Sequence, residues 1–409
     1  MSMRRFTAKK LALARALDPL LGALFFCLGL RRRPGPIDDR EIRRILVFEF
    51  QFLGDVVMAT PALRALRKRF PRASITLAAP ASAAGIERHL PWVDRVVTFD
   101  CPWASHRYDW ASLVRTCRFV KRLRSTPWDL AVEVRGDLRN ILLAFFTGAR
   151  RRVSFAVTGG DYLLTDVVPY QAGHLKHQLE GNLEVMKYLG CDIGENFPEL
   201  AIDEEADRSV RDTLAGLGRP LIGLHPCASR ANKWWEISKW VEVADRLVEE
   251  HGATLVLIHG PAATDREMIS RIGESVRHKE RCLSYSRSLS HLIAMIGRLD
   301  LLIALDSVAS HIAAAVRTPF VTLFGPQDPD YIRPYHFLGR VVIGEGFPCD
   351  CGGECRYGSD NRCMKAIETG DVLKAARDVL RDRLEAERGH TTMREPPLGG
   401  ARHEQNEIR

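Results

Sequence analysis

Polar side chains follow an apolar, strand-like run most clearly at Asp306 and Ser307. The run LDLLIAL precedes them and the helix-like stretch SHIAAAV follows, ending before Pro319. A strand buried on both faces of a parallel sheet reads as such an uninterrupted apolar run, and Asp and Ser are good N-cap residues. The turn would aim backbone N–H groups and the positive end of a helix dipole at one point. It therefore predicts a phosphate-binding site formed by Asp306, Ser307, Val308 and His311.

Two other stretches have the same arrangement of a strand followed by a polar turn. Leu53-Gly54-Asp55 follows the run RILVFEF, and HPCASRANKWW follows the apolar residues 220–224. Gly54 would let the backbone approach a ligand closely, and Asp55 would face a crevice at the strand ends. Ser229 can donate a hydrogen bond to a phosphate oxygen, and Lys233 supplies a mobile positive charge.

Each stretch also has a plainer interpretation. Asp55 and Asp306 would then serve only as helix caps, and His311 would be a packed helix residue. The loop at 225–235 would be a solvent loop anchored by aromatic side chains. The stretches taken one at a time leave these alternatives open.

The elements that must position these residues alternate between strand and helix along the chain. Strand-like runs occupy 43–50, 74–79, 93–100, 128–136, 219–226, 254–261, 299–305 and 320–324. Helical patterns lie between most of them, with one main helix expected to start from an N-cap at Thr60 and another to end on Gly252. This alternation predicts an α/β fold of parallel units. No Walker motif occurs, and no GxGxxG follows a strand, so a nicotinamide dehydrogenase is disfavoured.

The length of 409 residues predicts two folded domains. The polar, loosely patterned segment 197–218 is the expected boundary region. We therefore expect a basic N-terminal segment, two domains and a disordered polar tail. Their expected ranges are 1–42, 43–205, 206–388 and 389–409.

The positive charge is concentrated at the N-terminus. Residues 1–44 hold eleven Lys and Arg against four Asp and Glu, within a net charge of +8. A nucleic-acid partner is not expected, because its binding surface would spread over a folded face. Three interpretations of the apolar segment 11–30 remain open: a helix lying on the anionic inner-membrane surface, an uncleaved signal anchor, or a helix packed on the protein itself.

Four cysteines lie close together, at Cys349, Cys351, Cys355 and Cys363. No convincing secretory cleavage site is present, which favours a reduced, cytosolic setting. The cluster is consistent with a structural zinc or iron–sulfur site, and free thiols or disulfides stay open as alternatives.

Together, LGDVVMATPALRALR, HPCASRANKWW and DSVASHIAAAVRTPFVTLFGPQDP resemble one family in their order and spacing. It is glycosyltransferase family 9, the ADP-heptose:lipopolysaccharide heptosyltransferases, and the resemblance covers roughly residues 44–380. It implies the GT-B arrangement of two Rossmann-like domains facing across a cleft. The nucleotide-sugar donor would lie mainly on the C-terminal domain and the acceptor mainly on the N-terminal one. It also implies an inverting reaction without a catalytic metal, and a structural role for the cysteines.

The resemblance assigns roles to the polar residues. Asp55 matches the general base that takes the acceptor hydroxyl's proton. Lys233 matches the cation that offsets charge on the leaving diphosphate, and Asp306 the donor-site aspartate that contacts sugar hydroxyls. Ser229 would contact phosphate. The backbone N–H groups from Ser307 onward, with His311, would hold the diphosphate.

The sequence also departs from this family. Ser307-Val308 stands where Gly or Thr-Gly is usual, and Val does not readily adopt a positive φ. Residues 49–52, Glu-Phe-Gln-Phe, replace the usual Arg-x-Ser-Ser of the acceptor-facing loop. We therefore expect a heptosyltransferase peripheral on the cytoplasmic face of the inner membrane, acting on a lipopolysaccharide-core or related glycolipid that differs from the ordinary one. The alternatives are a non-catalytic sugar-nucleotide-binding protein and a family 9 transferase for another sugar.

Overall fold

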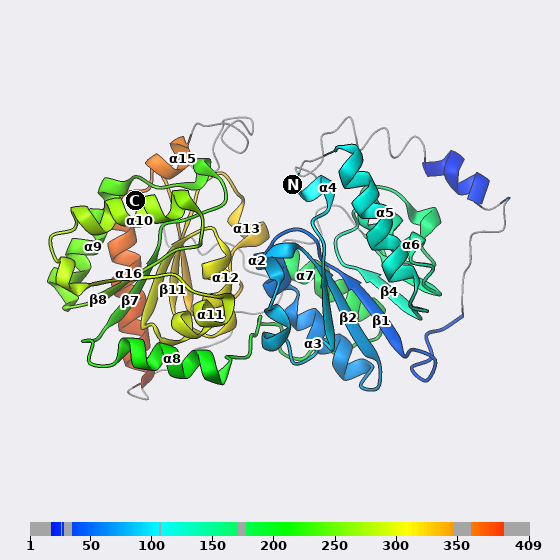
Figure 1. Cartoon of the computed structure of the whole chain (residues 1–409), viewed down its shortest axis with the longest axis horizontal. Helices are drawn as coiled ribbons and strands as arrows, with labels where there is room; N and C mark the ends of the chain where they lie inside the picture. The colour runs from blue at the N-terminus through cyan, green and yellow to red at the C-terminus, as the bar shows by residue number, and fades with distance from the viewer. Residues whose placement is uncertain are drawn as a thin grey trace. The chain divides into compact units, whose positions relative to one another are not determined.

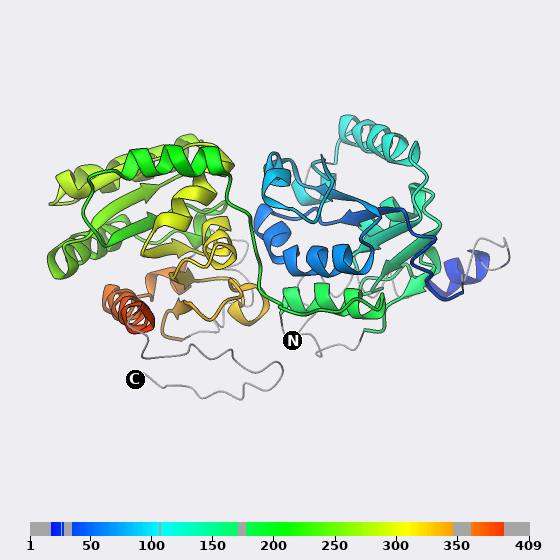
Figure 2. The same ribbon diagram turned by 90° about the horizontal axis from the view of Figure 1, so that it is seen from below.

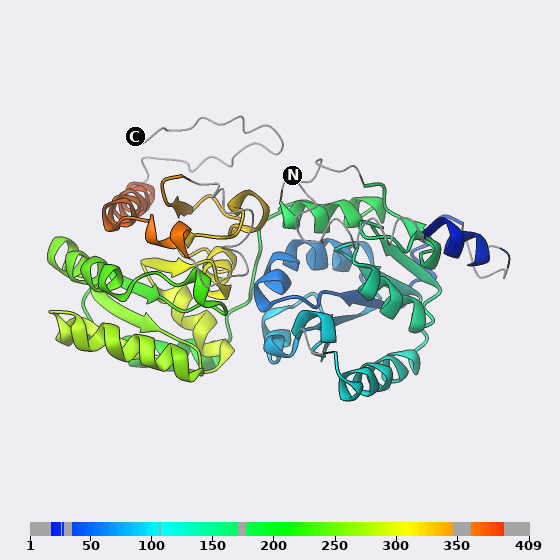
Figure 3. The same ribbon diagram turned by 90° about the horizontal axis from the view of Figure 1, so that it is seen from above.

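The computed structural model describes residues 18–25, 27, 35–105, 108–170, 177–346 and 361–387. The chain divides into two compact units. One comprises Met1–Val210, Ser288–Ala294 and Pro329–Arg333, and the other Arg211–Arg287, Met295–Asp328 and Pro334–Arg409. Each unit is built around a six-stranded sheet with helices on both faces (Figures 1, 2 and 3). The described strand pairings are parallel, as the alternating pattern predicts.

The sheet of the first unit has the strand order β3-β2-β1-β4-β5-β6. Its strands are β1 (Arg44–Phe48), β2 (Ser74–Ala79), β3 (Arg95–Thr98), β4 (Leu130–Glu133), β5 (Arg151–Ser154) and β6 (Asp166–Val167). Its helices are α2 (Leu53–Met58), α3 (Thr60–Arg69), α4 (Pro102–Ser105), α5 (Trp110–Arg124), α6 (Leu138–Phe146) and α7 (Gln178–Tyr188). The chain winds outward in opposite directions from β1 and β4. The crevice beyond their carboxyl ends is where such sheets bind ligands.

The sheet of the second unit repeats this plan, with the order β12-β11-β10-β7-β8-β9. Its strands are β7 (Leu221–His225), β8 (Thr254–Ile258), β9 (Cys282–Tyr285), β10 (Leu301–Leu305), β11 (Phe320–Phe324) and β12 (Gly339–Ile343). Its larger helices are α9 (Ile237–His251), α10 (Ala263–Ser275), α12 (Val308–Ala315) and α16 (Thr369–Glu387), and α11 (Leu289–Arg298) is divided between the two units. The strand order reverses between β7 and β10, whose following loops hold the predicted phosphate-binding residues.

Apolar packing explains why the strands read as uninterrupted hydrophobic runs. Every residue of β7, β8, β10 and β11 is buried. One core cluster joins these strands to α9, α10 and α16 and includes the fully buried Trp240. In the first unit, β1 and α5 share a core in which Phe50 contacts Phe99 and Phe119. The sheet positions are therefore fixed by burial on both faces.

The structure confirms the predicted strand, turn, helix and strand at residues 300–324 and the end of α9 at Gly252, whose φ is 62°. Two expectations are wrong. Leu53-Gly54-Asp55 is the first turn of α2, not a loop. Ala59, not Thr60, is the N-cap of α3, and the Thr60 hydroxyl instead donates to Val57 O at 2.7 Å. The segment 197–218 also contains a helix that was not predicted, α8 (Glu204–Leu214), which buries only Ala206 and Val210.

The described part of the N-terminal segment, residues 18–25, is helical. Leu21 and Phe25 pack against the cluster of Ile141, Tyr162 and Leu163, so this part lies on the protein itself. Among the described residues, no helix has both the length and the apolar character needed to cross a membrane. The expected disordered tail, 389–409, lies outside the described residues.

Candidate active site

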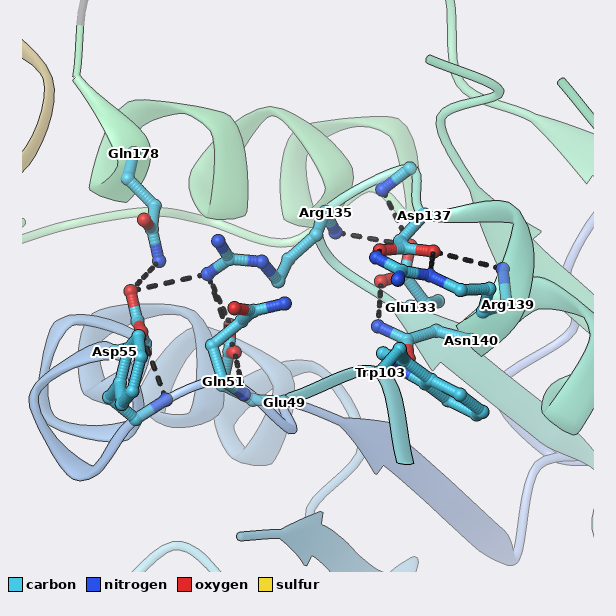
Figure 4. Close-up of polar contacts among 12 residues, drawn as sticks. Glu49, Gln51, Asp55, Trp103, Glu133, Arg135, Asp137, Arg139, Asn140 and Gln178 are labelled. Atoms are coloured by element: carbon cyan, nitrogen blue, oxygen red, sulfur yellow. Dashed lines mark hydrogen bonds and ion pairs between the residues drawn. The ribbon is translucent and has the colours of Figure 1, made fainter. Parts of the chain in front are cut away.

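Asp55 lies in the first turn of α2, just beyond the carboxyl end of β1. Its Oδ2 accepts a hydrogen bond from Phe52 N–H at 3.0 Å, so Asp55 caps the helix from its third position, and the N-cap itself is Phe52. The other oxygen, Oδ1, accepts from Gln178 Nε2 at 2.6 Å and lies 3.2 Å from Arg135 Nη1 (Figure 4). The residue is 7% exposed. Asp55 is thus a capping residue that also belongs to a buried polar cluster.

Arg135 is the cation of this cluster and comes from the loop after β4. Its Nη1 lies 3.4 Å from Glu49 Oε1 as well as 3.2 Å from Asp55 Oδ1. The register pairs Phe48 with Glu133, so the loops after β1 and β4 start side by side and bring these charges together. Glu49 is completely buried. One guanidinium therefore serves two carboxylates.

Glu133, at the end of β4, holds the loop that carries Arg135. Its Oε2 accepts from the backbone N–H groups of Arg135 and Gly136 at 3.1 and 2.6 Å and from Ser154 Oγ at 2.6 Å. Its Oε1 accepts from Asn140 Nδ2 at 3.0 Å. Burial raises the pKa of Glu133 to about 7, against the opposing effect of these donors. The loop geometry therefore depends on a fully buried carboxyl group.

Gly136 completes this loop for a steric reason. Its φ is 71°, and a Cβ there would lie 2.5 Å from Val157 Cγ2. A side chain at this position would meet both backbone strain and a clash. The sequence marked this loop only as a polar end to a predicted strand, so Arg135, Gln178 and Glu133 were missed. The signal that was present is a charged residue at the end of a mostly apolar run, as at Asp306.

In the second unit, Lys233 and Asp306 form a buried ion pair. Lys233 Nζ lies 2.5 Å from Asp306 Oδ2 and donates to Asp306 O at 3.2 Å. Their side chains are 14% and 6% exposed. Lys233 ends the short 3-10 turn Ala231–Lys233 after β7, and Asp306 follows β10 directly. Two residues separated by 73 positions meet because β7 and β10 are neighbours in the sheet.

Two buried histidines lie beside this pair. Burial lowers the pKa of His311 to about 4, and that of His225 likewise to about 4, so both rings are neutral near pH 7. The Nδ1 atom of His311 is buried without a hydrogen-bond partner among the described residues. His225 Nδ1 lies 3.2 Å from the hydroxyl of Ser307, the N-cap of α12. His311 therefore presents a polar atom that the described protein leaves unsatisfied.

Two predicted donor residues differ from expectation. Ser229 lies in an exposed turn and makes no hydrogen bond to any residue the structure describes. Val308 is the first residue of α12. Its φ is not positive, because Arg317 is the single non-glycine residue with a positive φ among the described residues. The left-handed backbone that would have required glycine at 308 is absent. Backbone strain is therefore no objection to Val308, and the effect of its side chain on close approach of the donor stays a prediction.

Most of the predicted cysteine cluster lies outside the residues that the structure describes. Cys349, Cys351 and Cys355 are outside the described residues. Cys363 lies in the short helix α15 (Arg362–Lys365) and is buried. The proposed structural metal therefore stays a prediction.

The family of the chain follows from comparison with known proteins. The model for "Glycosyltransferase family 9 (heptosyltransferase)" matches residues 116–351. The chain belongs to this family. It is 27% identical over 298 residues to lipopolysaccharide heptosyltransferase 3 of Escherichia coli, covering 70% of this chain and 84% of that protein. It is 22% identical to the lipopolysaccharide core heptosyltransferase OpsX of Haemophilus influenzae, covering 75% and 86%.

Solved structures agree on the fold. The E. coli ADP-heptose lipopolysaccharide heptosyltransferase II has a TM-score of 0.67 at 22% identity and covers 83% of this chain and 99% of that chain. A family 9 glycosyltransferase from Veillonella parvula has a TM-score of 0.72 at 23% identity and covers 85% and 98%. The predicted family and the GT-B fold class are confirmed. The protein is a glycosyltransferase.

Proposed function

We propose that the protein is an inverting heptosyltransferase that moves a heptose from a nucleotide-diphosphate donor, ADP-heptose, to a lipopolysaccharide-core or related glycolipid. The names of its relatives support the sugar and the acceptor class. The observation that carries the proposal is the pairing of Asp55 with a buried cation in one unit and of Lys233 with Asp306 in the other. Each lies where its sheet reverses strand order, the usual ligand position in such folds. Residues 43–205 would bind the acceptor and 206–388 the donor.

In the proposed reaction, an acceptor hydroxyl oxygen attacks the anomeric carbon of the heptose. The bond from that carbon to the diphosphate oxygen breaks as the new glycosidic bond forms, and Asp55 accepts the hydroxyl proton. Asp55 is suited to this because Arg135 and Gln178 hold its Oδ1 in one orientation. A positioned carboxylate loses little freedom when the substrate arrives.

The donor diphosphate would bind at the start of α12. Backbone N–H groups at a helix N-terminus favour an anion, and Lys233 would stabilise charge growing on the leaving diphosphate. Asp306 would then accept hydrogen bonds from sugar hydroxyls. The buried, unpartnered Nδ1 of neutral His311 is suited to a hydrogen bond with the donor. Ser229, on its exposed turn, would reach a phosphate oxygen only after loop closure.

The experiment is a transfer assay with ADP-heptose and a panel of lipid acceptors, reading ADP release and glycolipid product. Asp55→Asn keeps the shape and the oxygen that accepts from Gln178 but cannot take a full proton. We expect its kcat to fall about 100-fold or more, with thermal stabilisation by ADP-heptose retained. Wild-type turnover by Asp55→Asn would refute the base assignment. Donor binding without transfer to any acceptor would favour the non-catalytic alternative.

The location belongs to the same proposal. A glycolipid acceptor places the enzyme at the cytoplasmic face of the inner membrane as a peripheral protein. Leu20 and Leu24 of the described N-terminal helix are 69% and 51% exposed, which suits contact with lipid. The donor sugar is tested by thermal shift with several nucleotide sugars. Stabilisation by another sugar and not by ADP-heptose would identify a different family 9 transferase.

A further inference from the structure

The outward face of α5 carries residues that neither polar cluster uses. Positions spaced by three or four residues share one stripe of a helix. The stripe on α5 is Trp110, Leu113, Cys117, Lys121 and Arg124, and all of these are exposed. Trp110 is 78% and Leu113 50% exposed. The opposite side of the helix packs into the core through Ser112, Phe119 and Leu123. The helix is therefore anchored on one side and presents an apolar end and a basic end on the other.

The charge of α5 has one sign. Its sequence, WASLVRTCRFVKRLR, holds five basic residues and no acidic one. Arg118, Lys121, Arg122 and Arg124 make no ion pair with any residue that the structure describes. Arg115 lies 4.0 Å from Asp109, the N-cap of the helix. Four cations thus remain uncompensated on a helix whose first turns expose Trp and Leu.

α5 packs beside α6, as Figure 1 shows. α6 ends on Phe146, which is 47% exposed, and the helix at residues 18–25 exposes Leu20 and Leu24. On α5 itself, the exposed Trp110 and Leu113 lie on the same stripe as unpaired cations, and this combination marks an interaction surface.

We propose that the outward face of α5 docks onto an anionic lipid bilayer. Trp110 and Leu113 would enter the headgroup boundary, where Trp is favoured. Lys121 and Arg124, with the flanking arginines, would contact anionic headgroups. The combination of an amphipathic ring, an aliphatic side chain and unpaired cations on one stripe fits a bilayer better than an acidic protein, which would not need the apolar end. The inference rests on the proposed function only in that a glycolipid acceptor lies in such a bilayer.

The test is co-sedimentation of the full chain with vesicles of phosphatidylethanolamine and phosphatidylglycerol, compared with phosphatidylcholine vesicles. We expect binding to the anionic vesicles that weakens with salt. Lys121→Gln/Arg124→Gln should weaken it about 30-fold, at roughly 1 kcal/mol per cation. Trp110→Ser/Leu113→Ser should weaken it at both low and high salt. Arg208→Gln/Arg271→Gln removes the same charge from exposed sites on α8 and α10 and should bind like the wild type.

Thermal unfolding first establishes that each variant is folded. The proposal is overturned if both α5 variants bind vesicles like the wild type, or if the control loses as much. It is also overturned if the face proves to hold a second copy, seen as a wild-type dimer that the α5 variants dissociate without loss of vesicle binding. Transfer is then compared on vesicle-embedded and on water-soluble, deacylated acceptor. The α5 variants should lose activity only on vesicles. Wild-type protein that binds vesicles but transfers to neither acceptor would refute the proposed function and leave the docking intact.

Discussion

Replacing Glu133 by glutamine should remove a pH dependence of stability that the buried carboxyl creates. The pKa of Glu133 is raised from the ordinary 4.5 to about 7 by burial. Between these values the folded protein holds a proton that the unfolded chain releases, so protonation favours the folded state. This contribution is complete below about pH 4.5 and is lost as the pH rises through about 7. The amide introduced by Glu133→Gln would resemble the neutral carboxyl and would stay neutral at every pH.

The size of the effect follows from the difference between the two pKa values. Each pKa unit corresponds to about 1.4 kcal/mol. From pH 5 to pH 8, the free energy of unfolding of the wild type should therefore fall by about 2 to 3 kcal/mol relative to Glu133→Gln. The measurement is urea unfolding of both proteins across this range, read as a difference. His225 and His311, whose pKa values burial lowers, titrate in both proteins and cancel in that difference.

Glu267→Gln provides the matched control. Glu267 is an exposed carboxylate on α10, and its replacement should give a difference that stays flat with pH. A flat difference for Glu133→Gln as well would refute the reasoning. It would mean that the four donors around Glu133 offset the effect of burial, so that its pKa is the same in the folded and unfolded protein. A difference of the opposite sign would mean that the donors outweigh burial.

Two further changes test the buried ion pairs. Arg135→Met removes the guanidinium that pairs with Glu49 and Asp55 and should lower the free energy of unfolding by about 3 kcal/mol. Adding Glu49→Gln should recover part of this but not the transfer rate, and full recovery of both would contradict a positioning role. Lys233→Gln should lower kcat about 100-fold in the transfer assay. Pairing it with Asp306→Asn should restore thermal stability without restoring turnover, so recovered turnover would contradict the proposed role of Lys233.

The sequence predicted the parallel α/β plan because its central strands are buried on both faces. LLIAL and FVTLF are buried along their whole length, so their sequences show no alternation of polar and apolar residues that could be mistaken for an amphipathic helix. The edge strand β3 was predicted within residues 93–100. The edge strands β6 and β12 were not, since β6 has two residues and β12 is only half-buried. α8 was missed because it buries only two of its eleven residues, so its sequence has few apolar residues at helical spacing. Asp55 was assigned to a turn because the helix α2 begins without a capping hydroxyl or amide side chain.

A site residue was predictable where the residues that follow one strand were enough to indicate it. Asp306 and Lys233 each follow an apolar run, and their pairing needed only the adjacency of β7 and β10. Arg135 needed more, since its role depends on which loop lies beside the end of β1. That neighbour is β4, and Arg135 lies 80 positions along the chain from Asp55. The backbone strain expected at Val308 was overestimated, because α12 begins there with ordinary helical backbone.

Both units place a buried pair of carboxylate and cation where the strand order reverses. In the first unit, Arg135 serves two carboxylates, so an arriving neutral hydroxyl can compete for Asp55 Oδ1 without leaving the guanidinium unpaired. In the second unit, Lys233 and Asp306 have a one-to-one pair, so a diphosphate that attracts Lys233 must leave Asp306 with another partner. Sugar hydroxyls of the donor can supply that partner. An anion without a sugar cannot, and it would leave a buried carboxylate uncompensated. The pair should therefore favour a sugar-bearing diphosphate over the bare nucleotide released as product.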